Sequence, residues 1–419
     1  NVTVNANPDS PESIFLNNIA DDDDGGAIGA DKDVNIFNSK FTGNTAKEDG
    51  GAICTLNGTV SVNNCAFGSN RAEGSANPCY GGAIKGKNVE VHSCDFNNNF
   101  AENHGGAIYA TSVTIDNAVP SSFASNTAKK GEGGAIYTDY LNENIRYLTL
   151  YDNSAAIDNS DDGGAIYLNK ENHVTFSQCS IVSNHCGDEG GAIYLDSTNS
   201  HISLINNIII ANRAGDEGHV VFNKGNYDTI NNNWWGDINP SSSNGLLVEW
   251  KSVGSNVHHV DSDPLKSQLK IEDNPVGINE TAVATYYFVK SDGSLFTGEL
   301  EAPVSFILPE NIIKESSGKT KNTAYIKFKA NKAGTYTITA NLHGQMVSNT
   351  VTITDNEKVD PNLSIKVNNI TEGQNAVAVI NANNTLNGKA EVKLNSSTET
   401  YQVNIVNGTG NVKIGRAHV

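Results

Sequence analysis

Apolar and polar residues alternate along the first half of the chain in short runs, each bounded by Gly or Asn. Alternation with a period of two predicts β-strands whose side chains point to opposite faces. A Gly-Gly-Ala-Ile motif opens one such run in every unit, and successive copies lie 24 to 31 residues apart. The copies begin at Gly25, Gly50, Gly81, Gly105, Gly133, Gly163 and Gly190, and a degenerate eighth copy occupies 218–221.

Two further motifs recur between these copies. In one, an apolar residue stands three positions before an Asn, and the other is a short apolar-x-apolar run. Each unit therefore holds three short strands separated by three Gly- or Asn-rich corners. The first motif is found at Phe41/Asn44, Phe67/Asn70, Phe96/Asn99, Phe123/Asn126, Leu150/Asn153, Ile181/Asn184 and Ile209/Asn212, and the second at Val60/Val62, Val89/Val91, Val113/Ile115, Val174/Phe176 and Ile202/Leu204.

This repeat predicts an all-β fold, a parallel β-helix with three strands per coil. The segments are too short for helices, and the period is too short for a four-stranded propeller blade. Stacked coils satisfy both constraints, because each coil buries its apolar side chains against its neighbours. We expect Ile166, Leu168, Ile193 and Leu195 to point inward, Phe67, Phe96 and Phe123 to stack, and Asn70, Asn99, Asn126 and Asn184 to form a hydrogen-bonded corner ladder.

The pattern changes after Trp234 and Trp235. We expect this Trp pair to cap the last coil, with stacking on sugars as the alternative. Alternating strands then follow over about 90 residues, which suits an Ig-like sandwich, and no Cys lies beyond Cys186 to form an inter-sheet disulfide. The predicted domains are a β-helix with a C-terminal cap (1–264), an Ig-like β-sandwich (265–357) and a second, truncated Ig-like repeat (358–419).

The pairing of Gly-Gly-Ala-Ile with Phe-x-x-Asn resembles the repeats of chlamydial polymorphic outer membrane proteins. The stretch Asn231-Asn232-Asn233-Trp234-Trp235-Gly236, followed by Ig-like repeats, is similar to adhesin-like surface proteins of methanogenic archaea. Together these resemblances cover nearly the whole chain. They imply a right-handed parallel β-helix, the fold of pectin lyases, on a cell surface, with Ig-like domains as spacers toward an anchor.

Composition and charge narrow the function classes. The chain carries 28 basic and 47 acidic residues, a formal net charge of -19. Phosphate backbones repel such a surface, so we expect no nucleic-acid partner. No apolar run approaches the roughly 20 residues of a membrane-spanning helix. Low charge content and many turn residues favour an extracellular protein.

Both ends of the sequence suggest a fragment. The chain does not begin with Met. Its last six residues, 414–419, break the preceding pattern and match what a sequencing adapter would encode. We therefore expect truncation at both ends, with the anchor outside the fragment.

An aromatic row is the main candidate site. The residue after Gly-Gly-Ala-Ile is aromatic in five consecutive coils, and since the preceding apolar residue points inward, these rings should point outward. A flat stripe of aromatic faces can stack on sugars or anchor a protein partner. The alternative is a self-stacking ladder that stiffens the sheet. The row consists of Tyr109, Tyr137, Tyr167 and Tyr194, followed by Phe222.

The acidic residues, the histidine pair and the cysteines are further candidate sites, and each also has a purely structural interpretation. Acidic residues precede many Gly-Gly pairs, as at Asp161-Asp162 and 188–189, and could bind Ca²⁺ or form a solvated corner. His258-His259 fits a surface loop better than a metal site. The six cysteines fit small buried residues, although pairing of Cys54 with Cys79 or of Cys179 with Cys186 stays open. Sequons occur at Asn57, Asn279, Asn362, Asn369, Asn383, Asn395 and Asn407.

The sequence thus predicts a non-enzymatic, extracellular, adhesin-like surface protein without a cofactor, a metal or catalytic residues. Its β-helix would present a lateral surface to glycans or proteins of other cells. The alternatives are a structural envelope or stalk component without a ligand, a polysaccharide lyase or hydrolase of the β-helix type, and an autotransporter passenger. Polygalacturonase motifs are missing, and the acids recur as repeats rather than as the separated pair of an inverting glycosidase.

Overall fold

The computed structural model describes residues 1–5, 11–74, 78–155, 161–236, 250–252, 261–272, 274–355, 363–367, 375–382, 387–393 and 400–416. Every regular element in these ranges is a β-strand, and they contain no helix long and apolar enough to cross a membrane. The chain divides into two compact units. One comprises Asn1–Asn274, Thr281–Lys329 and Thr335–Val351, the other Pro275–Glu280, Ala330–Gly334 and Thr352–Val419.

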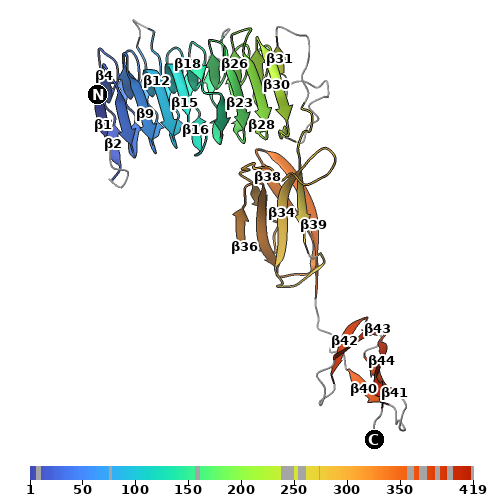
Figure 1. The fold of residues 1–419 in the computed structure, drawn as a ribbon. Helices are drawn as coiled ribbons and strands as arrows, with labels where there is room; N and C mark the ends of the chain where they lie inside the picture. Colours follow the sequence, from blue (N-terminus) through green and yellow to red (C-terminus); the bar gives the residue numbers. More distant parts are fainter. Residues whose placement is uncertain are drawn as a thin grey trace. The chain divides into compact units, whose positions relative to one another are not determined.

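The largest sheet forms one wall of the β-helix (Figure 1). Its strands are parallel and in register, so that Ile108 lies between Ile84 and Ile136. The motif strand and the apolar-x-apolar run share this wall. The strands are β1 (Val2–Val4), β4 (Ile28–Ala30), β5 (Val34–Phe37), β8 (Ile53–Thr55), β9 (Thr59–Asn63), β12 (Ile84–His92), β15 (Ile108–Ile115), β18 (Ile136–Leu141), β22 (Ile166–Leu168), β26 (Ile193–Leu195), β29 (Val221–Asn223) and β31 (Trp250–Ser252).

In later coils the apolar-x-apolar run belongs to a separate four-stranded sheet. This sheet consists of β19 (Asn144–Arg146), β23 (His173–Ser177), β27 (His201–Ile205) and β30 (Asn226–Asn231). The second wall carries the Phe-x-x-Asn motif. Its strands are β2 (Ser13–Leu16), β6 (Ser39–Thr42), β10 (Ala66–Gly68), β13 (Asp95–Asn97), β16 (Ser121–Ala124), β20 (Leu148–Tyr151), β24 (Ser180–Val182) and β28 (Ile208–Ile210).

A third wall follows each motif Asn. The alternation pattern does not predict it, because each strand is two residues long and most point a single small side chain inward. The three strands per coil are therefore present, but two of the predicted ones lie on one wall. The third-wall strands are β3 (Ile19–Ala20), β7 (Thr45–Ala46), β11 (Arg71–Ala72), β14 (Phe100–Ala101), β17 (Thr127–Ala128), β21 (Ser154–Ala155) and β25 (His185–Cys186).

Stacks of like residues fill the interior. The isoleucines of the Gly-Gly-Ala-Ile motif are buried, and so are Leu168 and Leu195. Phe41, Phe67 and Phe96 stack in parallel with centroid separations of 4.8 and 4.9 Å. These inward stacks confirm the predicted faces, and burial of this apolar surface is the main force that joins the coils.

An amide ladder runs along the corner between the second and third walls. The Nδ2 of Asn126 donates to Oδ1 of Asn153 at 2.9 Å and to the carbonyl oxygen of Phe96 at 3.0 Å. Every member is buried, so each amide needs these partners. We call this ladder the asparagine column; its members are Asn44, Asn70, Asn99, Asn126, Asn153, Asn184 and Asn212.

Glycine pairs are required at the corner that opens each motif. The first glycine is left-handed, as at Gly105 with φ of +67°, where a Cβ would lie 2.3 Å from the carbonyl oxygen of Ile108. The second glycine faces the next coil, since a Cβ on Gly106 would lie 2.0 Å from the carbonyl oxygen of Gly134. The first position thus needs glycine for its backbone conformation, and the second for the close approach of two coils.

The end of the β-helix is closed by large buried side chains. Trp234 and Trp235 are 0% and 1% exposed. Trp235 belongs to the same apolar core as the coils, and Trp234 pairs with Ile208 as an added parallel bridge. This burial supports the capping role and leaves the Trp pair no free ring face for a sugar.

The region from 266 to 354 forms two four-stranded sheets in the arrangement of an Ig-like sandwich. Tyr286, Phe288, Ile326, Phe328 and Ile338 are buried. One sheet holds β32 (Lys266–Ile271), β34 (Ala282–Val289), β37 (Thr323–Ala330) and β36 (Ile312–Lys319), and the other β33 (Val276–Gly277), β39 (Gln345–Thr354), β38 (Gly334–Leu342) and β35 (Ser305–Ile307).

The C-terminal strands form a second, smaller β structure around Ile380, Val392, Val403 and Ile405. It contains β40 (Ser364–Val367), β41 (Asn375–Asn381) and β44 (Thr409–Arg416) in one sheet, and β42 (Gly388–Lys393) with β43 (Thr400–Ile405) in another. The predicted fold class, an all-β parallel β-helix followed by Ig-like sheets, is confirmed. The domain boundaries after 264 and 357 stay predictions.

Candidate functional site

The predicted aromatic row is a continuous feature of the largest sheet. Each of its residues follows the buried apolar residue of its coil and points to the opposite side. Register pairs Tyr109 with Tyr137, Tyr137 with Tyr167, and Tyr167 with Tyr194, and Phe222 follows. The structure therefore brings all four predicted tyrosines together.

The rings stack on one another, with their faces turned along the row. Tyr109 and Tyr137 have ring centroids 5.0 Å apart and an interplanar angle of 13°, and Tyr137 and Tyr167 are 5.1 Å apart at 6°. Tyr167 is only 8% exposed and Tyr194 3%. The expectation of a flat stripe of aromatic faces open to solvent therefore needs correction. Neighbouring rings cover these faces, so edges and hydroxyl groups point away from the sheet.

A second row runs beside the tyrosines. It is formed by the residue directly before each Gly-Gly pair, and most of its members are acidic. Asp162 Oδ1 accepts a hydrogen bond from the backbone N–H of Glu189 at 3.0 Å, and Asp24 Oδ1 accepts one from Asp49 at 2.8 Å. The row consists of Asp24, Asp49, Tyr80, His104, Glu132, Asp162, Glu189 and Glu217.

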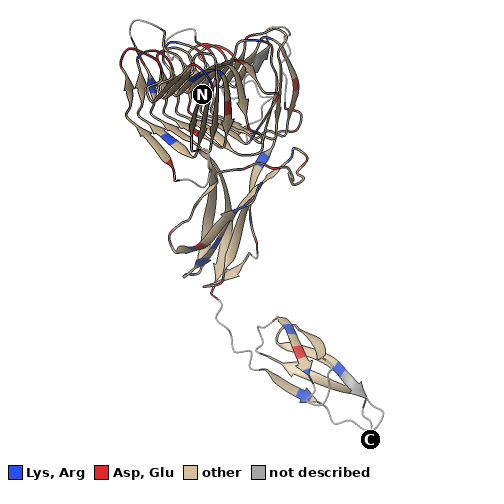
Figure 2. Ribbon diagram, turned by 60° about the vertical axis from the view of Figure 1, so that its left-hand side comes forward, with Lys and Arg blue, Asp and Glu red and all other residues tan. Residues whose placement is uncertain are grey.

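The two rows touch, because Tyr80 and His104 of the second row each pack beside the tyrosine of the next coil. Tyr80 stacks on Tyr109 at 4.6 Å, and His104 lies 5.0 Å from Tyr137 in a tilted arrangement. We call the combined surface the corner face. Figure 2 shows acidic residues recurring from loop to loop along the β-helix. The corner face comprises Tyr80, His104, Tyr109, Glu132, Tyr137, Asp162, Tyr167, Glu189 and Tyr194.

Burial and mutual repulsion shift the acid–base equilibria of the corner face. Burial, with the nearby charges of Glu189, Asp188 and Glu132, raises the pKa of Asp162 to about 7. Burial and neighbouring acids also raise the pKa of Glu189 to about 7. Burial raises the pKa of Tyr194 to about 12. At neutral pH the phenol of Tyr194 is therefore protonated, whereas the two carboxylic acids are only partly ionised.

Lysines end the corner face on both sides, a feature the sequence interpretation missed. Lys85 occupies the row position before Tyr109 and pairs with Asp49. Lys224 pairs with Asp196, and its Nζ lies 5.4 Å from the ring centroid of Tyr194. The signal was present in the sequence, because Lys85 directly follows Gly-Gly-Ala-Ile.

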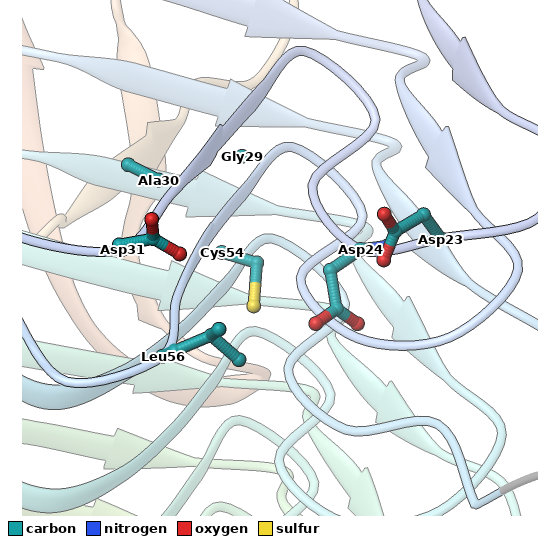
Figure 3. A pocket seen from close by; sticks show the side chains of 7 residues that line it. All are labelled: Asp23, Asp24, Gly29, Ala30, Asp31, Cys54 and Leu56. Atoms are coloured by element: carbon teal, nitrogen blue, oxygen red, sulfur yellow. The ribbon is translucent and has the colours of Figure 1, made fainter.

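A hollow lies at the N-terminal end of the row, where Gly29 and Cys54 replace the large side chains. It has a volume of about 290 Å³ and is lined by Asp23, Asp24, Gly29, Ala30, Asp31, Cys54 and Leu56. Figure 3 shows the Cys54 thiol lying among the carboxylates of Asp24 and Asp31. Burial, reinforced by Asp24, raises the pKa of this thiol, so it is protonated and a weak nucleophile at neutral pH.

The Ca²⁺ alternative, which the sequence leaves open beside a solvated acidic corner, has one geometric candidate among the described residues. Carboxylate oxygens of Asp23, Asp24 and Glu48 lie within 4.8 Å of one another. Ca²⁺ takes six to eight oxygens, and Asp24 Oδ1 already accepts the N–H of Asp49. A solvated acidic corner therefore stays the prediction, and calcium binding its untested alternative.

The cysteines, the histidine pair and the sequon asparagines are the remaining candidates from the sequence. All six cysteines are buried, including Cys65 and Cys94, which stack in adjacent coils as expected. The pair His258-His259 lies outside the described residues, as do the sequons at Asn362, Asn369, Asn383 and Asn395. The other three sequon asparagines, Asn57, Asn279 and Asn407, are exposed.

Comparison with known families identifies the repeat. Residues 38–56, 93–111 and 120–139 match the repeat of Chlamydia polymorphic membrane proteins. These stretches hold the motif strands and corners described above. They support the resemblance to the chlamydial repeats, and nothing in the matches supports an origin in methanogenic archaea. No curated protein matches the chain.

Two solved structures illustrate a weak structural likeness. FdeC, described as a broadly conserved Escherichia coli adhesin, is 16% identical with a TM-score of 0.20, and the match covers 36% of this chain and 56% of that one. Domains 5–6 of the S-layer protein SbsC are 15% identical with a TM-score of 0.18, covering 37% and 99%. The chain thus spans just over half the length of the FdeC structure.

Proposed function

We propose that the protein is a non-enzymatic, adhesin-like component of a cell surface or envelope. The repeat match supports this location, because the three stretches that match the polymorphic membrane protein repeat each hold one Phe-x-x-Asn and one Gly-Gly-Ala-Ile unit of this chain. The β-helix offers a lateral surface, and the Ig-like sheets act as spacers. Many copies per cell convert weak contacts into avidity without an active site.

The observation that carries the recognition role is the corner face. It repeats one arrangement of phenol and carboxylate from coil to coil, and Tyr109 and Tyr137 remain partly exposed within it. The accessible groups are ring edges, hydroxyls and carboxylates. We propose that Tyr109, Tyr137, Tyr167 and Tyr194 hold this surface in shape, and that glycans or proteins of another cell contact its exposed edge.

A structural role without a ligand is the second candidate. Tyr167, Tyr194 and Phe222 form a buried apolar cluster of their own, with Tyr137 packed against it. A continuous ring stack stiffens the sheet whether or not anything binds. This observation favours a rod-like envelope component as the alternative.

Retention of the fluorescent full-length chain on intact microbial cells and on a polysaccharide panel separates the two. The variant Tyr109→Ser/Tyr137→Ser alters the exposed end of the row. Tyr151→Ser is the matched control, because Tyr151 is 43% exposed on a different wall. Saturable retention lost only in the double variant supports recognition by the corner face. No retention of the parent protein on any surface refutes it and leaves the structural role.

A further inference from the structure

We propose that the middle of the corner face, from Tyr109 to Tyr194, binds lysine side chains of a basic protein segment. This inference rests on the proposed function, because it names the partner chemistry of the same surface. It is carried by three observations: the chain's own docked lysines, an uncompensated stretch between them, and the orientation of the rings.

The chain's own lysines show which group fits the face. The Nζ of Lys224 pairs with Asp196 and sits above the ring of Tyr194. At the other end Lys85 takes the place of a tyrosine and pairs with Asp49, which lies in the acidic row. Both lysines thus bring an ammonium group to a carboxylate of this surface, and Lys224 adds a contact with an aromatic ring.

The stretch between these lysines lacks such cations. In the coils of Tyr109, Tyr137 and Tyr167, the two rows and the position two residues after each tyrosine contain no Lys or Arg. Glu132 lies 2.6 Å from Nδ1 of His104, whereas Asp139 and Asp162 have no cationic side-chain partner among the described residues and contribute negative charge there. Asp139 accepts a hydrogen bond from Nδ2 of Asn169 at 2.7 Å, a neutral donor that leaves its charge uncompensated.

Repulsion among these acids adds to the free-energy cost of ionising Asp162. The raised pKa of Asp162 has burial as its largest cause, and Glu189, Asp188 and Glu132 add to it. A cation placed between them would relieve this repulsion and gain affinity in the process. The face is thus complementary to positive charge in a place where the protein supplies no Lys or Arg and only His104 pairs with an acid.

Ring orientation selects the ammonium group over other partners. Sugars and guanidinium groups bind aromatic residues mainly through free ring faces, and neighbouring rings cover the faces within this row. An ammonium ion needs only oxygen atoms, and the partly exposed residues Tyr137, Asp139 and Asp162 supply hydroxyl and carboxylate oxygens. Lysine carries that charge on a flexible stem, which can reach acids on successive coils about 4.8 Å apart.

Binding of a fluorescein-labelled octalysine peptide to the full-length chain tests the proposal by anisotropy. The variant Asp139→Asn/Asp162→Asn/Glu189→Gln removes two acids of the corner face and the adjacent Asp139. The new amides keep an acceptor oxygen, which at position 162 can still accept the backbone N–H of Glu189. The control Asp95→Asn/Glu171→Gln/Asp228→Asn removes three acids from strands or turns outside the face. Both triples remove three acidic groups, and an assay near pH 8.5, above the pKa of about 7 of Asp162 and Glu189, gives them nearly the same net charge. Their melting temperatures report whether they fold.

We expect the face variant to weaken octalysine binding by about tenfold or more and the control by less than about twofold. Equal weakening in both variants would show a general charge attraction and overturn the proposal, and so would binding that acetylation of the peptide lysines leaves unchanged. Failure of this proposal can be distinguished from failure of the proposed function, because octalysine binding tests the first and retention on cells tests the second. Retention that depends on Tyr109 and Tyr137 without octalysine binding keeps the recognition surface and removes only lysine as its partner.

Discussion

The indole N–H of Trp235 donates a hydrogen bond of 2.9 Å to Oδ2 of Asp261, a carboxylate that is 2% exposed. The same oxygen accepts the backbone N–H and the Nδ2 of Asn233 at 2.9 and 3.0 Å. Asn233 in turn accepts from Asn207, so Asp261 ends a short amide ladder beneath the Trp cap. One carboxylate oxygen thereby accepts three hydrogen bonds near the C-terminal end of the β-helix.

Replacing Asp261 with Ala should weaken the cap more than a surface change does. Three donors lose their acceptor in a buried place, and each unsatisfied group costs about 1–3 kcal/mol. We expect the free energy of unfolding of the β-helix to fall by roughly 3 kcal/mol or more. Urea unfolding followed by Trp fluorescence measures this. Asp228→Ala, at an exposed site, is the control, and equal effects of the two changes would contradict the capping role.

The asparagine column should tolerate no loss of a member. Asn126→Ala removes a side chain that donates to Asn153 and Phe96 and accepts from the N–H and Nδ2 of Asn99. We expect a loss of about 2–4 kcal/mol, because the remaining partners stay buried. Thermal unfolding compares it with Asn97→Ala, an exposed residue of β13, for which the expected change is within about 0.5 kcal/mol. A mild effect of Asn126→Ala would mean that water replaces the missing amide.

The second glycine of each pair should be the stricter one for stacking. A Cβ on Gly106 meets the backbone of the next coil, and its φ is not in the left-handed region, so the predicted cost is a clash between coils. We expect Gly106→Ala to destabilise the β-helix by about 3 kcal/mol or to prevent soluble expression. Gly29→Ala is the matched control, since its Cβ would have 3.4 Å of room and should be nearly neutral.

Stability should fall as the pH rises from about 4 to neutrality. Asp162 and Glu189 have folded-state pKa values of about 7, above their ordinary values of 3.8 and 4.5. The folded protein therefore holds these protons more tightly than the unfolded chain, and ionisation costs stability between about pH 4 and pH 7. Because both groups are partly solvated, we expect a combined effect on the order of 1–2 kcal/mol.

Melting temperatures of the parent protein and of Asp162→Asn/Glu189→Gln between pH 5 and pH 8 measure this effect. The parent should lose several degrees over this interval, and the double variant should lose less, because its amides do not titrate. Identical slopes for the two proteins would assign the pH dependence to other groups. Added salt should flatten the parent's slope, since part of the cost is repulsion among exposed acids.

The sequence predicts those features of the molecule in which the same distinctive residue recurs once per coil. The glycine pairs, the Phe stack and the asparagine column each leave one conspicuous residue per coil, and all three occur where the spacing places them. The third wall is missed because Thr45–Ala46 and its equivalents have no alternation to detect. A recurring Asn-x-Ala pattern, as at Asn44 and Ala46, is the signal that identifies it.

The candidate site is predicted in position and misjudged in geometry. Alternation correctly sends Tyr109 and Tyr137 to the side opposite the core. It says nothing about the side-chain torsions, which turn each ring toward its neighbour rather than toward solvent. The pattern can place Lys85 in the row of tyrosines, but it cannot predict the ion pairs of Lys85 with Asp49 and of Lys224 with Asp196, because each pair joins different coils.

The asparagine column has a direction, and this affects how such a chain can change in length. Each amide donates its Nδ2 hydrogen to the following coil and accepts from the preceding one, so every interior coil presents the same pair of connectors. A whole coil inserted or deleted leaves all connectors matched, whereas a partial coil leaves one donor and one acceptor stranded. Gene duplication and unequal recombination in units of one repeat are therefore structurally neutral, and the reach of the rod becomes a trait that evolution can adjust in whole steps.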